Sequence, residues 1–143
     1  MTTDGGATFH TVGTFAHPHG GNQLFNAGAS TAYVGASGGG VWRSTDSGTT
    51  WKALAGSSDN GYANGVIGTA GWLYAWDDGA NAGGIGNPHL VKAPRNPGTA
   101  WTKVTVPTAM NNGGKTMATA YDGTHYVLVS GSWNAGIWRY VEP

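Results

Sequence analysis

Seven carboxylate side chains are the residues of this 143-residue chain with the potential for acid–base chemistry. Hydrolysis of a glycosidic bond, for example, needs two carboxyl groups at a defined separation. Asp77 and Asp78 are neighbours at the end of a predicted strand, so their side chains point in opposite directions. The other five lie in predicted turns, in a polar loop or at the C-terminus: Asp4, Asp46, Asp122, Asp59 and Glu142. We therefore predict no catalytic residue, and a fragment of a glycoside hydrolase is kept as an alternative.

A second group of residues is suited to binding sugars, because aromatic faces and short polar groups line carbohydrate sites. The segment from Trp72 to Gly79 offers both at the end of a predicted strand, and a Gly/Ser/Asn-rich loop offers them again further along the chain. The candidate ligand-binding residues are Trp72, Trp76, Asp77, Asp78, Trp133 and Asn134. Packing of the three tryptophans between sheets is the alternative, and their burial separates the two interpretations.

Metal and cofactor chemistry has weak support in the sequence. His17 and His19 flank a proline, but no third ligand lies nearby in sequence, so a polar loop is the better interpretation. The chain has no cysteine, which excludes thiolate ligands and disulfides. The run Gly38–Gly40 is not followed by Lys-Ser/Thr or by a predicted helix, so it is a hairpin turn and not a phosphate loop. We expect no metal and no cofactor.

The elements that position these residues are organised around an eight-residue motif, Ser44–Trp51, with the pattern S-x-D-x-G-x-T-W. It recurs as Thr2–Phe9 and, in a degenerate form, as Pro94–Trp101. Asp and Ser/Thr side chains hold a turn by bonding backbone N–H groups, Gly supplies a positive φ, and the final aromatic residue starts the next strand. The residues assigned to these turns are Asp4, Gly6, Ser44, Asp46, Gly48, Trp51, Asn96, Gly98 and Trp101.

The motif resembles the Asp-box (BNR) repeat of sialidase-like and xyloglucanase-like β-propellers. The resemblance implies an all-β fold of four-stranded antiparallel blades, with each box at the rim and away from the binding face. It also implies, for a sialidase, an arginine cluster and a Tyr–Glu nucleophile pair. Only Arg43, Arg95 and Arg139 are present, and the first and last occupy equivalent repeat positions, so we predict no sialidase activity.

Repeat spacing supports three blades in one domain. Trp42 and Trp138 are 138 − 42 = 96 positions apart, which is two repeats averaging 48. We place the blades at residues 14–56, 62–107 and 114–143, with a strand at Phe9–Val12 in the N-terminal segment 1–13 completing the third. Many glycines and aromatics with few charged residues also favour short strands over helices.

Three blades do not close a ring, because propellers have about four to eight. We therefore expect a homodimer that forms one six-bladed ring, in which the N-terminal strand of each copy completes the last blade of its partner. The expected function is a non-enzymatic, lectin-like binding module for glycans that assembles from half-propeller chains. The alternatives are a purely structural assembly protein, engineered or natural, and the C-terminal half of a longer propeller.

The composition also limits the partners. A net charge of zero argues against a broad nucleic-acid surface, and no charge run suggests an anionic membrane. No apolar run approaches the roughly 18 residues of a membrane helix, and no signal-peptide pattern opens the chain. We expect a soluble protein. The sequence does not indicate its cellular compartment, and secretion as part of a longer protein is one alternative.

Overall fold

The computed structural model describes residue 2 and residues 4–11, 23–36, 40–57, 63–77, 89–110, 114–132 and 136–143. Every regular element in these ranges is a β-strand. The predicted all-β fold class is therefore confirmed for this part of the chain. Within it, no helix has the length and apolar character needed to cross a lipid bilayer.

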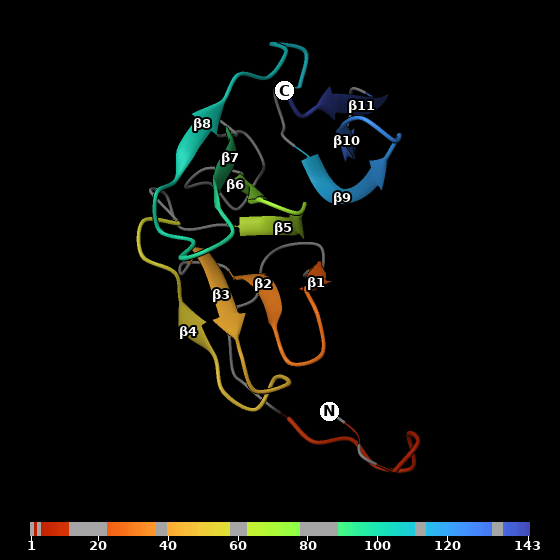
Figure 1. The fold of residues 1–143 in the computed structure, drawn as a ribbon. Coiled ribbons are helices and arrows are strands. Elements are labelled where there is room, and N and C mark those ends of the chain that lie inside the picture. Colours follow the sequence, from red (N-terminus) through yellow and green to blue (C-terminus); the bar gives the residue numbers. More distant parts are fainter. Residues whose placement is uncertain are drawn as a thin grey trace.

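The strands form three antiparallel sheets in which sequence neighbours are hydrogen-bonded neighbours (Figure 1). The first sheet contains β1 (Leu24–Asn26), β2 (Ala32–Ala36), β3 (Gly40–Ser44) and β4 (Lys52–Ala53). The second contains β5 (Ala63–Gly68), β6 (Trp72–Asp77), β7 (His89–Pro94) and β8 (Thr102–Val104). The third contains β9 (Gly114–Tyr121), β10 (Tyr126–Ser132) and β11 (Gly136–Val141).

The strand expected at Phe9–Val12, which is assigned to the last blade of a partner copy, is not formed within the described single chain. Residues 9–11 belong to no strand, and Val12 lies outside the described residues. Figure 1 shows the N-terminal segment, in red, beyond the first sheet and far from the third. A strand needs a neighbouring strand to satisfy its backbone groups, and this segment lacks one in the described single chain. The third sheet correspondingly has three strands instead of four.

The second sheet lies between the other two, because β5 contacts β1 and β2 on one side and β9 on the other. Two apolar cores fill the interfaces. The core between the first and second sheets contains Tyr33, Val41, Leu54, Val66, Leu73 and Ala75. The core between the second and third sheets contains Ile67, Tyr74, Trp76, Leu90, Met110, Met117 and Leu128, with Trp138 and Tyr140 packed against it.

The first and third sheets have the same orientation in the stack. Tyr33 pairs with Arg43, and the face they share meets the second sheet. Trp138 pairs with Ser130, and the face they share also meets the second sheet. Trp42 is the repeat equivalent of Trp138, yet it lies on the opposite face from Tyr33 and so points away from the second sheet. The stack is therefore head-to-tail, since equivalent faces of the first and third sheets point the same way.

One face at each end of the stack consequently lies outside both cores. The third-sheet outer face, defined here by Val129, Ile137, Arg139 and Val141, has Ile137 80% exposed and Val141 42% exposed. The first-sheet outer face, defined by Leu24, Val34 and Trp42, is less exposed: Leu24 is 56% exposed, but Val34 is buried and Trp42 is half-buried. Isolated exposed apolar residues are ordinary, but those of the third sheet gather on one face.

Polar side chains also tie the sheets together. The Arg95 guanidinium donates from Nη2 to the carbonyl of Ala27, directly after β1, at 2.6 Å, and from Nη1 to that of Thr69 at 3.2 Å. Gln23 bonds with both backbone groups of Met117: its Oε1 accepts from the N–H at 2.8 Å, and its side-chain amide donates to the carbonyl. This second contact joins the residue before β1 directly to β9.

Candidate functional site

The turn at Ser44–Trp51 is held by its own side chains. Asp46 accepts from the Thr50 hydroxyl at 2.6 Å, from the Thr50 N–H at 2.8 Å and from the Ser44 hydroxyl at 2.8 Å. Ser44 Oγ accepts in turn from the Gly48 N–H at 2.8 Å, and Gly48 has a φ of 85°. The bonds to Thr50 and Ser44 lower the pKa of Asp46 to about 2. Asp46 is therefore ionised at neutral pH and engaged in its turn, which is unsuited to a general acid.

The N-terminal turn repeats this network residue by residue. Asp4 accepts from the hydroxyls of Thr2 and Thr8 and from the Thr8 N–H, and Thr2 Oγ1 accepts from the Gly6 N–H. These bonds hold the pKa of Asp4 well below its usual range, with the Thr2 hydroxyl as the largest cause. Gly6 has a φ of 95°. The segment thus forms the turn without forming the strand that follows it.

The degenerate motif keeps only part of the geometry. Trp101 donates from Nε1 to the Gly98 carbonyl at 2.9 Å, as Trp51 does to that of Gly48 at 3.0 Å. Gly98 has a φ of 82°, and Asn96 is exposed. The preceding residue, Arg95, bonds two carbonyl groups of neighbouring turns. The side chain at this position therefore joins two sheets.

Two of the predicted sugar-binding residues, Trp72 and Asp77, lie at opposite ends of one strand. Trp72 pairs with Pro94 at one end of β6, whereas Asp77 pairs with His89 at the other end. Trp72 is half-buried, and the Lys92 ammonium lies 4.5 Å from its ring centroid. Trp76 is 1% exposed. Trp76 therefore presents no open face to a sugar ring, and the Trp72 ring already has a cation over it.

Several predicted site residues cannot be placed in this geometry. The side chain of Asp77, together with Asp78, Trp133 and Asn134, lies outside the described residues. The same is true of His17, His19, Asp59, Gly38 and Gly39. The ligand-binding and hairpin predictions for these positions stay predictions.

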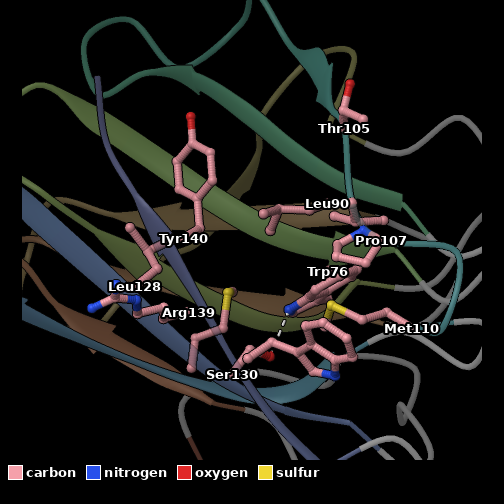
Figure 2. A pocket seen from close by; sticks show the side chains of 12 residues that line it. Trp76, Leu90, Thr105, Pro107, Met110, Leu128, Ser130, Arg139 and Tyr140 are labelled. Atoms are coloured by element: carbon pink, nitrogen blue, oxygen red, sulfur yellow. Dashed lines mark hydrogen bonds between the residues drawn. The ribbon is translucent and has the colours of Figure 1, made fainter.

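The pocket at Trp76 is apolar and lies between the second and third sheets. Figure 2 shows the Trp76 indole among Leu90, Met110 and Leu128, with its N–H donating to Ser130 Oγ at 2.9 Å. The cavity has a volume of about 170 Å³. Its lining is mainly apolar; the polar side chains among the lining residues are Thr105, Ser130, Arg139 and Tyr140 besides the two indoles, and Ser130 is engaged by Trp76. Trp76 therefore serves packing between two sheets.

A Tyr–Glu pair that the sequence did not reveal joins the second sheet to the C-terminus. Tyr74 donates from its hydroxyl to Glu142 Oε1 at 2.6 Å, and the same oxygen accepts from the Thr69 hydroxyl at 3.0 Å. The Glu142 N–H also donates to the carbonyl of Tyr126 at 2.8 Å. The sequence placed Glu142 at the C-terminus without indicating a partner, whereas in the structure its side chain contacts the second sheet.

This pair is not arranged as a nucleophile. Tyr74 is fully buried, and burial followed by the hydrogen bond to Glu142 raises the pKa of its hydroxyl far above the ordinary value. A nucleophilic hydroxyl needs access to substrate and easier loss of its proton. The nearby Arg95 guanidinium is occupied by backbone carbonyls. The Tyr74–Glu142 contact is a structural tie between the second and third sheets.

The other described carboxylate side chain, Asp122, closes the β9–β10 hairpin. Its Oδ1 accepts from the N–H groups of Thr124 at 2.8 Å and His125 at 2.7 Å, and these bonds lower the pKa of Asp122. The carboxylates with described side chains are thus each engaged in a turn or an inter-sheet tie. Nor do the described residues contain a group of three metal-ligating side chains. The chain matches no protein-family model and no curated protein sequence.

Proposed function

We propose that this chain is a non-enzymatic assembly and binding module: half of a β-propeller with Asp-box turns, which two copies complete as a six-bladed ring. The observation that carries the proposal is the head-to-tail stack, with an exposed apolar face on the third sheet and a less exposed apolar face on the first. Assembly is the function that the geometry supports best, because the described carboxylates are occupied and the described tryptophans are engaged in contacts within the chain.

The two outer faces are equivalent to faces that already meet inside the chain. Arg139 is the repeat equivalent of Arg43 (139 − 43 = 96), and the Arg43 face packs on the second sheet. Trp42 is the equivalent of Trp138, whose face packs on the second sheet from the other side. The third-sheet outer face of one copy therefore suits the first-sheet outer face of another. Such a contact is heterologous, and it ends only when a ring closes.

A hydrogen bond between the first two sheets predicts a specific contact in the assembly. The Arg43 guanidinium donates from Nη1 to the carbonyl of Pro97, in the third turn motif, at 3.4 Å. The equivalent donor in the third sheet is Arg139. Asn96 and Asp46 occupy the same motif position, so the two motifs are 96 − 46 = 50 positions apart. The equivalent of the Pro97 carbonyl is therefore the carbonyl of the partner's Ser47 (97 − 50 = 47). The pairing would extend the existing stack without a new kind of contact.

The contact between Gln23 and Met117 limits the shape of such a ring. Because it joins β1 to β9 directly, the centre between the inner strands is narrow at this level. Both copies would contribute a Gln23 side chain to the centre. A ligand that binds the ring is therefore expected at the ends of the strands and not in an open central channel.

Solution mass tests the assembly. Light scattering behind size exclusion is expected to give 2 × 14.6 = 29.2 kDa for the native chain. Ile137→Asp, which places a charge on the third-sheet outer face, is expected to give the single-chain mass, because an unpaired charge in an apolar interface is costly. Thr108→Asp changes an exposed turn residue off both outer faces and serves as the control. A native chain of single-chain mass would overturn the ring and favour the fragment of a longer propeller.

Glycans are the ligand class that we propose for this module. The support comes from the sequence of the connections between second and third strands, which carry Asp78, Trp133 and Asn134. Titration calorimetry with soluble polysaccharides is expected to detect binding that Trp133→Ala abolishes and that Trp72→Ala leaves intact. Absence of heat with every polysaccharide class would remove the glycan part, and the purely structural assembly would then be the function.

A further inference from the structure

The outer edge of β11 has no partner strand among the described residues. In the first sheet β3 pairs with β4, and in the second β7 pairs with β8. Their counterpart β11 pairs with β10 alone in the part of the chain that the structure describes. An exposed edge strand presents a row of backbone donors and acceptors that favours the addition of another strand. The third sheet therefore has a position for one further strand.

The N-terminal segment has the features of that further strand. Its turn, Thr2–Thr8, has the hydrogen bonds of the turn that precedes β4, so it is already formed before any strand follows it. Phe9 occupies the position of Trp51 in the motif and is 76% exposed. Residues 4–11 are exposed throughout. The segment is thus a formed turn followed by an aromatic residue that has no core to pack into within its own chain.

The position of the N-terminal segment favours its addition to the third sheet of a second copy over addition to the third sheet of its own chain. In Figure 1 the N-terminal segment and β11 lie at opposite ends of the stack, with the second sheet between them. If a second copy stacks its first sheet on the third-sheet outer face, its N-terminal segment comes to lie beside β11. Between Thr11 and Leu24 lie 24 − 11 − 1 = 12 residues, against 63 − 53 − 1 = 9 between Ala53 and Ala63, which make the same crossing from one sheet to the next. The chain length therefore permits the exchange.

We infer that residues 9–11 of one copy add to the third sheet of its partner as a fourth strand on the edge of β11, in one defined register. The inference rests on the proposed ring and names the segment that closes it. In the first sheet, Arg43 lies opposite Lys52 and Trp42 lies opposite Ala53. The equivalent of a β3 residue in β11 lies 96 positions later in the chain. The equivalent of a β4 residue in the N-terminal segment lies 46 − 4 = 42 positions earlier. Arg139 then lies opposite the partner's His10, and Trp138 lies opposite the partner's Thr11.

Disulfide trapping tests both the exchange and its register, because the chain has no cysteine of its own. Residues opposite each other on antiparallel strands have Cα atoms about 4.5–5.5 Å apart, within the range that a disulfide spans. Two single variants, His10→Cys and Arg139→Cys, are unfolded together, refolded as a mixture and oxidised. The expected product is a covalent heterodimer on a non-reducing gel. Because each chain carries one cysteine, only a contact between chains joins the two variants to each other.

Matched pairs control the chemistry and the register. Arg43→Cys with Lys52→Cys in one chain occupies an observed pair and is expected to form an intrachain disulfide. A mixture of Thr11→Cys and Arg139→Cys is shifted by one residue, which turns the side chains to opposite faces, and is expected to cross-link at least tenfold less.

A two-chain mass without the His10–Arg139 heterodimer would overturn the exchange and leave the ring. A single-chain mass would overturn both. Cross-linking within one chain of the double variant His10→Cys, Arg139→Cys, without heterodimers, would show closure inside the chain and overturn the exchange.

Discussion

Replacement of Trp76 by alanine is expected to lower the free energy of unfolding by about 3–5 kcal/mol, the usual cost of removing a buried tryptophan. The indole is 1% exposed and lies between the second and third sheets, where it contacts the apolar side chains of one core. Its removal would add a cavity beside the existing one of about 170 Å³. Urea denaturation at a fixed protein concentration measures the effect.

Trp76→Phe separates packing from hydrogen bonding at the same position. It keeps an aromatic ring but removes the donor to Ser130, whose hydroxyl still donates to the Thr116 carbonyl at 3.2 Å. We expect a loss of about 1–2 kcal/mol, from one hydrogen bond and a small cavity. Trp51→Ala, at a half-buried turn position, is expected to cost less than Trp76→Ala. Polysaccharide binding lost in Trp76→Phe without a loss of stability would contradict the packing role.

The turns were the part of the molecule most accessible to sequence reasoning, because their structure is local. Asp46 bonds to residues two and four positions away, so the pattern of residue types contains nearly all the information. The same is true of the hairpin at Asp122, where the acceptor and both donors lie within three residues. Strands next to such turns are also predictable, since β3 and β4 must pair once the turn between them is set.

Contacts between sheets were less accessible, because the residues involved are far apart in sequence. Tyr74 and Glu142 are 142 − 74 = 68 positions apart, and nothing in either neighbourhood marks them as partners. Trp76 shows the same limit: its Trp-Asp-Asp context favoured a ligand site, but burial against β10 engages its N–H. The strand expected at Phe9–Val12 stays a prediction for a related reason, since a strand depends on a neighbour that the described single chain does not supply.

Gly114→Ala is expected to lower the free energy of unfolding by about 2 kcal/mol, within the range for overpacking a filled core. A Cβ atom at this position would lie 2.1 Å from Ser130 Oγ and 2.1 Å from Trp76 Nε1, the two atoms of one hydrogen bond. Neither can move away without breaking that bond, since the indole is enclosed on both sides by the core of the second and third sheets. The close approach of β9 to Trp76 therefore requires glycine.

A second glycine provides the control for this close approach. A Cβ atom at Gly71 has no heavy atom within 4 Å, and its φ is not in the left-handed region, so Gly71→Ala is expected to change stability by less than about 0.5 kcal/mol. The double variant Gly114→Ala, Trp76→Phe tests the cause, because it removes the Nε1 atom that the new methyl group meets. The double variant is expected to lose less free energy of unfolding than the sum of the losses of the two single variants, by at least about 0.5 kcal/mol. Full additivity would show that Gly114 is required for another reason, and that the bond between Trp76 and Ser130 does not set the distance between the second and third sheets.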